Sequence, residues 1–235
     1  MKKLLFPLLT VALLVAGGLY WLTDDLDENV AGAITQHGSA MSQARVGVEK
    51  VEIAPSSGKG VVTDLQVGNP KGFKTPFALR ASSIAVDIDL ATLTRDVTVI
   101  RSLVIDRPDV IYEKSNGTTN FDEIQKNIAV YLGPKGKPRQ QGNIRLIVEE
   151  LTLCNANAQA SGGFLSNKSI SIPLPDITLK NVGLARGGVT PGELGQEIAK
   201  AMNSKLRIAG NFERLKKSSG DSPDKADGAI KGPLK

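Results

Sequence analysis

The sequence predicts an α+β domain, mainly β-sheet with flanking helices, that follows an N-terminal transmembrane helix. Three observations support this fold class. An uncharged run of 19 residues covers Leu4–Leu22. Several later segments alternate apolar and polar residues at the period of two that a strand requires, and two segments begin with helix-capping residues. We therefore expect residues 24–215 to form a curved antiparallel sheet or groove with two or three short helices.

Residues 1–23 have the features of an uncleaved signal-anchor that crosses the membrane once. About 20 apolar residues span a bilayer as a helix, and the run Leu4–Leu22 has that length. Two lysines precede the run and four acidic residues between 24 and 28 follow it, so the positive-inside rule places the N-terminus in the cytoplasm. A cleaved signal peptide is the alternative, although the small residues at 16–18 are followed by a bulky Leu-Tyr-Trp segment.

Composition excludes several classes of function. The net charge of +5 comes without a dense block of lysine and arginine, so no nucleic-acid partner is expected. With a single histidine, His37, neither a catalytic triad nor a histidine-based metal site can be assembled. The single cysteine, Cys154, precludes an internal disulfide. We therefore expect a protein that is not an enzyme and that holds no metal or cofactor.

The first half of the domain is predicted to be rich in strands. Residues 26–40 form the helix that leaves the membrane, because Leu26, Val30 and Ile34 recur at a spacing of four. Turn signals rich in Gly, Pro, Asn and Ser separate the strands that follow, and an irregularity is expected near Glu49. The expected strands cover residues 46–53, 60–67, 80–90, 97–105 and 110–114.

The second half is predicted to mix helices and strands. One short helix has Asn120 as its N-cap and Glu123 in the capping-box position. Residues 133–142 are polar and rich in Gly and Pro, which indicates a mobile loop. Another helix begins after Thr190 as its N-cap, with Glu193 closing the capping box. The other expected segments are strands at 144–153, 168–174 and 176–182 and a disordered tail at 216–235.

The strand predicted at 80–90 carries the clearest candidate site. Its apolar face holds four aliphatic side chains, which are Ile84, Val86, Ile88 and Leu90. Such a face must be covered by something, because a strand with one polar and one apolar face buries the apolar one. Two alternatives are possible. In the first, the helices pack on this face as an ordinary core. In the second, the face lines a groove that admits an acyl chain or another apolar partner.

Several turn and strand-end motifs carry a resemblance to a known family. They are Asn69-Pro70-Lys71-Gly72-Phe73, Ile84–Asp89, Ile100–Val110, Asn116–Phe121 and Ile172–Leu179. In this order they resemble the N-terminal module of the AsmA-like proteins, which are β-rich periplasmic proteins anchored in the inner membrane of Gram-negative bacteria. The resemblance implies a β-groove with an apolar inner face, and a function in phospholipid movement and outer-membrane homeostasis.

Two functions are expected as alternatives. The first is a non-enzymatic protein, anchored in the bacterial inner membrane through Leu4–Leu22 with its C-terminal domain in the periplasm, whose groove binds phospholipid acyl chains or supports envelope assembly. The second is a structural or adaptor subunit that has a closed core and no ligand, and that docks onto a larger complex of other envelope proteins.

Overall fold

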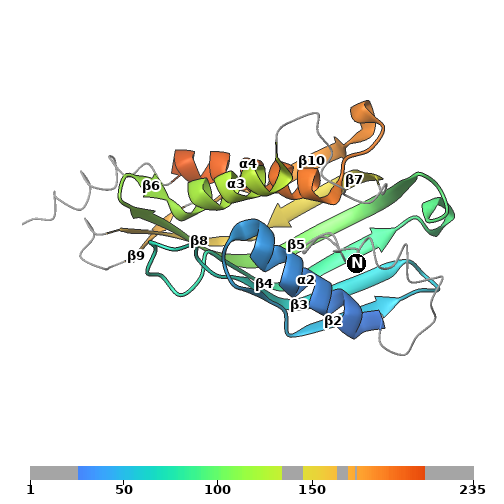
Figure 1. Cartoon of the computed structure of the whole chain (residues 1–235), viewed down its shortest axis with the longest axis horizontal. Coiled ribbons are helices and arrows are strands. Elements are labelled where there is room, and N and C mark those ends of the chain that lie inside the picture. Colours follow the sequence, from blue (N-terminus) through green and yellow to red (C-terminus); the bar gives the residue numbers. More distant parts are fainter. Residues whose placement is uncertain (1–25, 134–144, 163–168, 173, 210–235) are drawn as a thin grey trace, which may run out of the picture.

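The computed structural model of the chain describes residues 26–133, 145–162, 169–172 and 174–209 (Figure 1). The transmembrane helix expected at 1–23 and the tail expected at 216–235 lie outside the described residues, as does the loop expected at 133–142 apart from Gly133. Among the described helices, none has the length and apolar character needed to cross a bilayer.

The described residues form one large open sheet with three α-helices, which confirms the α+β fold class (Figure 1). The helices are α2 (Leu26–Ser42), α3 (Asn120–Leu132) and α4 (Pro191–Ala209). The strands are β1 (Val46–Gly47), β2 (Lys50–Ala54), β3 (Lys59–Val67), β4 (Leu79–Ile88), β5 (Val97–Ser115), β6 (Thr118–Thr119), β7 (Arg145–Cys154), β8 (Asn157–Gly162), β9 (Ser169–Ile172) and β10 (Ile177–Val182). The main path of the sheet runs β1-β3-β4-β5-β7-β10.

The sheet is mixed, so the expectation of an antiparallel sheet holds for only part of it. Strand β5 pairs in parallel with both β7 and β8, whereas β3, β4 and β5 pair antiparallel. The chain between β5 and β7 contains α3, and a crossover that contains a helix returns the chain in the same direction. Strand β8 was not expected at all, because its Asn-Ala-Gln-Ala-Ser-Gly sequence lacks the large apolar residues that mark a strand.

Strand β5 is one element of 19 residues, where the sequence predicted two strands on either side of Pro108. Proline removes a backbone donor and usually ends or edges a strand. Here the strand continues through the proline, and Arg107, the residue before it, adopts a left-handed conformation with φ 48°. The antiparallel pairing with β4 keeps its register across this point, with Asp106 opposite Ser83 and Pro108 opposite Ala81.

Left-handed residues lie on one line across the sheet. Asp64 in β3, Arg107 in β5 and Asn155 between β7 and β8 have φ values of 47°, 48° and 56°, and the register of the pairs beside them is continuous. Across the line the buried positions switch between even and odd residue numbers, as from Val62 to Leu65 in β3. Each left-handed residue therefore lies where the alternation of buried and exposed positions shifts. The apolar side chains therefore stay on one face although the strict alternation in the sequence is broken.

The helices pack on this apolar face and match the expected ranges closely. Helix α2 contacts β1 and β2, α3 contacts β5 and β6, and α4 contacts α3 and β10. The capping box of α4 is confirmed, since Thr190 N donates to Glu193 Oε2 at 2.7 Å and Glu193 N donates to Thr190 Oγ1 at 3.3 Å.

The cap expected for α3 was misplaced by one residue. Thr119 is the N-cap, and Asp122, rather than Glu123, completes the capping box. Thr119 takes this position because it has an extended backbone and its hydroxyl accepts from Asp122 N at 3.1 Å. Asn120 lies inside the helix with its side chain fully buried, where it serves the network described below.

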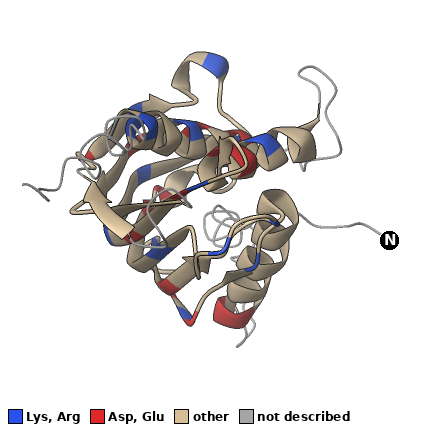
Figure 2. Cartoon of the chain, turned by 90° about the vertical axis from the view of Figure 1, so that its left-hand side faces the viewer, with Lys and Arg blue, Asp and Glu red and all other residues tan. Residues whose placement is uncertain are grey.

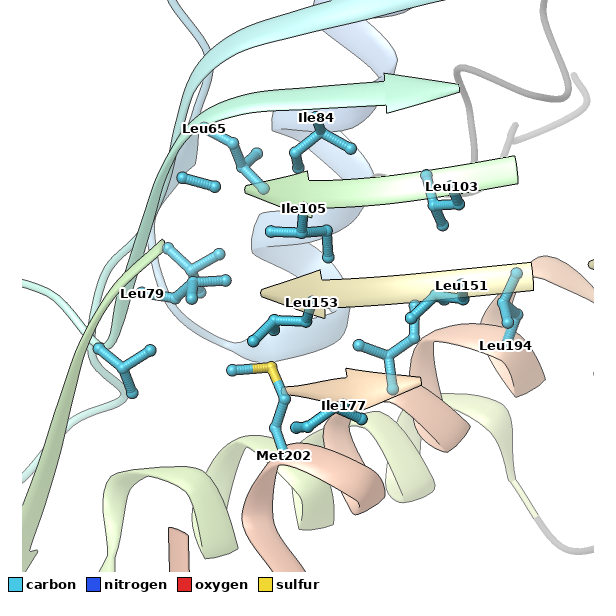
Figure 3. Close-up of a cluster of buried hydrophobic side chains, with 14 of the residues drawn as sticks. Leu65, Leu79, Ile84, Leu103, Ile105, Leu151, Leu153, Ile177, Leu194 and Met202 are labelled. Carbon is cyan, nitrogen blue, oxygen red and sulfur yellow. The ribbon is translucent and has the colours of Figure 1, made fainter. Parts of the chain in front are cut away.

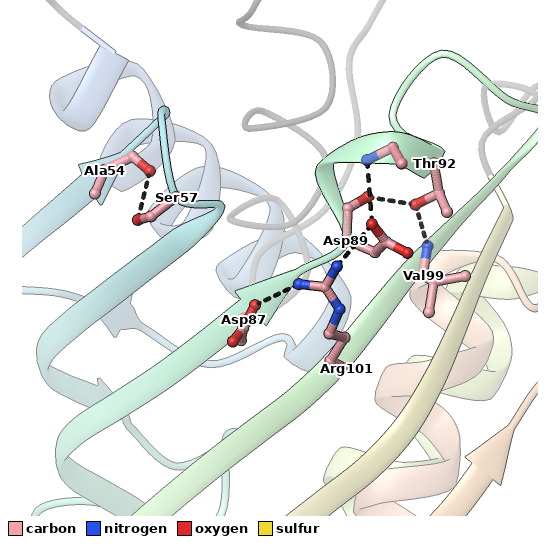
Figure 4. Close-up of polar contacts among 8 residues, drawn as sticks. Ala54, Ser57, Asp87, Asp89, Thr92, Val99 and Arg101 are labelled. Carbon is pink, nitrogen blue, oxygen red and sulfur yellow. Dashed lines mark hydrogen bonds and ion pairs between the residues drawn. The ribbon is translucent and has the colours of Figure 1, made fainter.

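The connection between β4 and β5 is a short 3-10 helix, η1 (Leu90–Thr92), closed by polar contacts on the outer side of the sheet (Figure 4). The Asp89 carboxylate accepts from Ala91 N at 3.1 Å and pairs with the Arg101 guanidinium at 2.8 Å. Arg101 also reaches Asp87 at 3.4 Å. The Asp89 carboxylate therefore caps the turn, and the carboxylates of Asp87 and Asp89 form surface ion pairs with Arg101.

Candidate functional site

Rows of aliphatic side chains cross the face of the sheet that bears the helices. We call them the three aliphatic rows, and each joins residues that are paired across neighbouring strands. The first row is Val62, Ile84, Ile105, Leu153 and Ile177; the second is Val86, Leu103, Leu151 and Leu179; the third is Ile88, Ile100, Val148 and Val182. Figure 3 shows members of the first two rows together with Leu194 and Met202 of α4.

Three of the four predicted site residues lie together in these rows. Ile84, Val86 and Ile88 are 4%, 6% and 0% exposed and belong to one continuous apolar cluster. Leu90 does not join them. Strand β4 ends at Ile88, and Leu90 lies half-buried in η1, where its side chain packs close to Gly58 in the turn between β2 and β3.

Sequence reasoning missed the rest of the rows because it considered one strand at a time. Leu103, Ile105, Leu151 and Leu153 alternate as clearly as the residues of β4 and are equally buried. Knowledge of the register was needed to join them into rows, and register comes from the pairing of the strands.

Helices α2 and α3 flank the rows and meet at one end of them. The Asn127 side chain of α3 donates from Nδ2 to the carbonyl oxygen of Ser42, the last residue of α2, at 2.9 Å. From this contact the two helices diverge across the sheet (Figure 1). At its other end α2 is held to the sheet edge, because the Asp27 carboxylate accepts from Ile53 N of β2 at 3.1 Å.

The reactive side chains of the described residues lie outside the rows. His37 in α2 is 6% exposed, and burial lowers its pKa. Burial also raises the pKa of the Cys154 thiol, which lies 3.6 Å from Asp106 Oδ1, so this cysteine stays protonated at neutral pH and is a poor nucleophile. In the described part of the chain, no cluster of three or more His, Cys, Asp or Glu side chains is placed to hold a metal ion.

Two of the motifs that carry the family resemblance meet in space. The Asn120 side chain donates to Asn69 Oδ1 at 2.8 Å and to the carbonyl oxygen of Ile111 at 2.7 Å. Asn69 in turn donates to the carbonyl oxygen of Thr75 at 2.7 Å. These asparagines therefore fix the loop between β3 and β4 against β5 and the start of α3, which is a structural role.

In comparisons with known proteins, no family model, no curated protein and no solved structure matches the chain.

Proposed function

We propose that the protein is a non-enzymatic, membrane-anchored envelope protein whose three aliphatic rows bind an acyl chain of a phospholipid. The observation that carries the proposal is the composition of the rows, which hold only Val, Ile and Leu side chains from five strands. Side chains within a row are about 4.8 Å apart, the spacing of neighbouring strands, so the surface is smooth, aliphatic and without a polar group to orient a head group. Such a surface suits a hydrocarbon chain better than a sugar, a base or a peptide.

The sequence supports both the membrane anchor and the periplasmic location of the domain. The run Leu4–Leu22 crosses the inner membrane once with the N-terminus in the cytoplasm, and residues 24–215 lie in the periplasm. Together with the resemblance to the AsmA-like proteins, this supports a location of the acyl-binding face in the compartment through which lipids pass to the outer membrane. We therefore propose lipid transport or envelope homeostasis as the process.

Access to the rows requires the helices to separate. Because Ile84, Val86 and Ile88 are at most 6% exposed, an acyl chain reaches them only when the helices packed on this face move. Each methylene that leaves water contributes about 0.8 kcal/mol, which offsets part of the cost of separating the helices.

The same burial favours the second candidate function. A face that is at most 6% exposed is also what a closed core presents, and a domain with a closed core acts through its outer surface. In that case the protein is a structural or adaptor subunit that docks onto other envelope proteins and takes no lipid.

A pair of aspartate variants separates the two. Val86→Asp places a carboxylate in the second aliphatic row, whereas Ala85→Asp places one on the exposed opposite face of the same strand as a matched control. The full chain is extracted in mild detergent, melted, and assayed for bound lipid by native mass spectrometry. A folded Val86→Asp protein that has lost lipid supports acyl binding.

The other outcomes are equally informative. A closed core cannot hydrate the new carboxylate, which then costs several kcal/mol, so an unfolded Val86→Asp protein beside a folded Ala85→Asp protein supports the adaptor. A wild-type protein that carries a stoichiometric protein partner and no lipid also supports the adaptor function. A folded Val86→Asp protein with lipid at the wild-type level shows that the ligand does not lie on this face.

A further inference from the structure

One end of the sheet gathers basic side chains from three separate segments. We call residues 43–47, 68–80 and 114–118 the basic tip. These segments contain no aspartate or glutamate, and their basic residues are Arg45, Lys71, Lys74, Arg80 and Lys114. Arg45, Lys71, Lys74 and Arg80 are exposed, and Lys114 is half-buried. Figure 2 views the molecule from this end, with Lys and Arg in blue.

Hydrogen bonds hold the three segments together. Gly68 N donates to the carbonyl oxygen of Arg45 at 2.7 Å, and the Ser115 hydroxyl donates to the carbonyl oxygen of Gly72 at 2.9 Å. The basic residues therefore belong to one surface, although the segments lie far apart in the sequence.

The central loop of the tip is fixed in shape by a buried carboxylate. Glu113 of β5, 6% exposed, accepts from the backbone N–H groups of Lys74 and Thr75 at 2.8 to 3.0 Å and from the Thr75 hydroxyl at 2.6 Å. The negative charge of Glu113 is thus turned inward onto the loop backbone, while the ammonium groups of Lys71 and Lys74 face solvent. A loop held in this way loses little conformational freedom when it binds.

The loop also presents aromatic side chains beside its lysines. Phe73 and Phe77 are half-buried, and the Arg80 guanidinium lies 4.9 Å from the centre of the Phe77 ring. An apolar ring next to ammonium groups is typical of surfaces that sit at the boundary between lipid head groups and acyl chains.

We propose that the basic tip docks onto an anionic phospholipid surface. Lysine and phenylalanine together favour lipid over a protein partner, because lysine is depleted in protein–protein interfaces, whereas each lysine near an anionic membrane adds to the attraction. The tip lies at the C-terminal end of α2, whose 17 residues rise about 25 Å from Leu26. It is therefore separate from the end at which the predicted anchor joins the domain.

The proposal is independent of acyl binding, because no residue of the three aliphatic rows belongs to the tip. To test it, the full chain is held in nanodiscs of neutral phosphatidylcholine. These are mixed with vesicles of phosphatidylcholine that contain phosphatidylglycerol, and binding is measured by vesicle flotation. Binding is expected to the anionic vesicles, to be absent with pure phosphatidylcholine vesicles, and to weaken as salt is added.

Paired lysine variants provide the control. Lys71→Ala/Lys74→Ala is expected to lower the partition coefficient about 30-fold, the effect of two lysines near an anionic surface. Lys59→Ala/Lys180→Ala removes the same charge from exposed positions outside the tip and is expected to bind as the wild type does. All these substitutions are of exposed side chains, and thermal melts confirm that each protein is folded.

Two results overturn the proposal. One is a wild-type protein that fails to bind the anionic vesicles; if it then binds polyglutamate, the tip recognises an acidic protein instead. The other is equal binding by the two double variants, which shows that vesicle binding depends on net charge alone and not on the tip.

Discussion

At the scale of single residues, the carboxylate of Glu113 has a structural role. Its carboxylate lies at the end of β5 and accepts from three donors on Lys74 and Thr75, while Glu113 N donates to Asn120 Oδ1 at 3.0 Å. Buried charges are tolerated only where hydrogen bonds replace the lost water. The loop between β3 and β4 thus depends on a residue about 40 positions further along the chain.

We predict that Glu113→Gln destabilises the protein by about 2 kcal/mol. The amide keeps the size of the side chain but has no charge, and it turns one NH₂ group toward backbone donors, so charge-assisted hydrogen bonds are lost. Denaturant unfolding measures the change, and Glu149→Gln, at an exposed position of β7, is the control. Equal stabilities of the two variants would show that the Glu113 carboxylate is not needed to hold the loop.

His37 predicts a dependence of stability on pH. Burial lowers the pKa of His37 below its ordinary value of 6.5, so below pH 6.5 the unfolded chain takes up a proton more readily than the folded chain. The free energy of unfolding therefore falls as the pH decreases from 6.5 toward the pKa of the folded state, and this contribution is constant at higher pH. Melting temperatures measured between about pH 8 and 5 should show this fall in the wild type and a smaller one in His37→Gln. Parallel curves would contradict the prediction.

At the scale of elements, local signals predicted the helices and strands well wherever neighbours in sequence decide the outcome. The capping box of α4 needs only Thr190, Glu193 and the turn between them, and it was found. The start of α3 was misplaced because Asn120 is as good a cap by type as Thr119. Its side chain instead donates to Asn69, which lies 51 positions earlier in the sequence, and accepts from Glu113 of β5.

The predicted cap of α4 gives a direct measurement. Thr190→Ala is expected to destabilise the protein by about 1 kcal/mol, because the N–H of Glu193 loses its acceptor, whereas Thr190→Ser should be nearly neutral. Thermal melts of the full chain compare the two. If alanine and serine have the same effect, the hydroxyl of residue 190 does not stabilise the helix.

At the scale of the whole molecule, the candidate site could be predicted only in part. Alternation in β4 identified Ile84, Val86 and Ile88, but the rows exist because β5 and β7 run parallel and place Ile105 beside Leu153. No local pattern specifies that a crossover will bring two distant strands into this register. The left-handed line through Asp64, Arg107 and Asn155 also hid the continuity of the face, since it breaks the alternation that marks a strand.

The contact between α2 and α3 is the point at which the molecule is expected to open. Asn127 joins α3 to the last residue of α2 through a hydrogen bond, and the two helices diverge from this contact (Figure 1). If acyl chains enter there, Asn127→Ala should speed the exchange of a fluorescent phospholipid between vesicles and the full chain in nanodiscs. The cost in stability should be only about 1 kcal/mol, the worth of one hydrogen bond.

The control for this variant is Asn157→Ala. It removes a side-chain bond of the same length, 2.9 Å to Asp109, from within the sheet and leaves the α2–α3 contact intact. Thermal melts give the loss of stability in each variant, and a faster exchange in Asn127→Ala alone assigns the effect to the helix pair rather than to general loosening. Equal exchange in both would mean that lipid does not enter between α2 and α3.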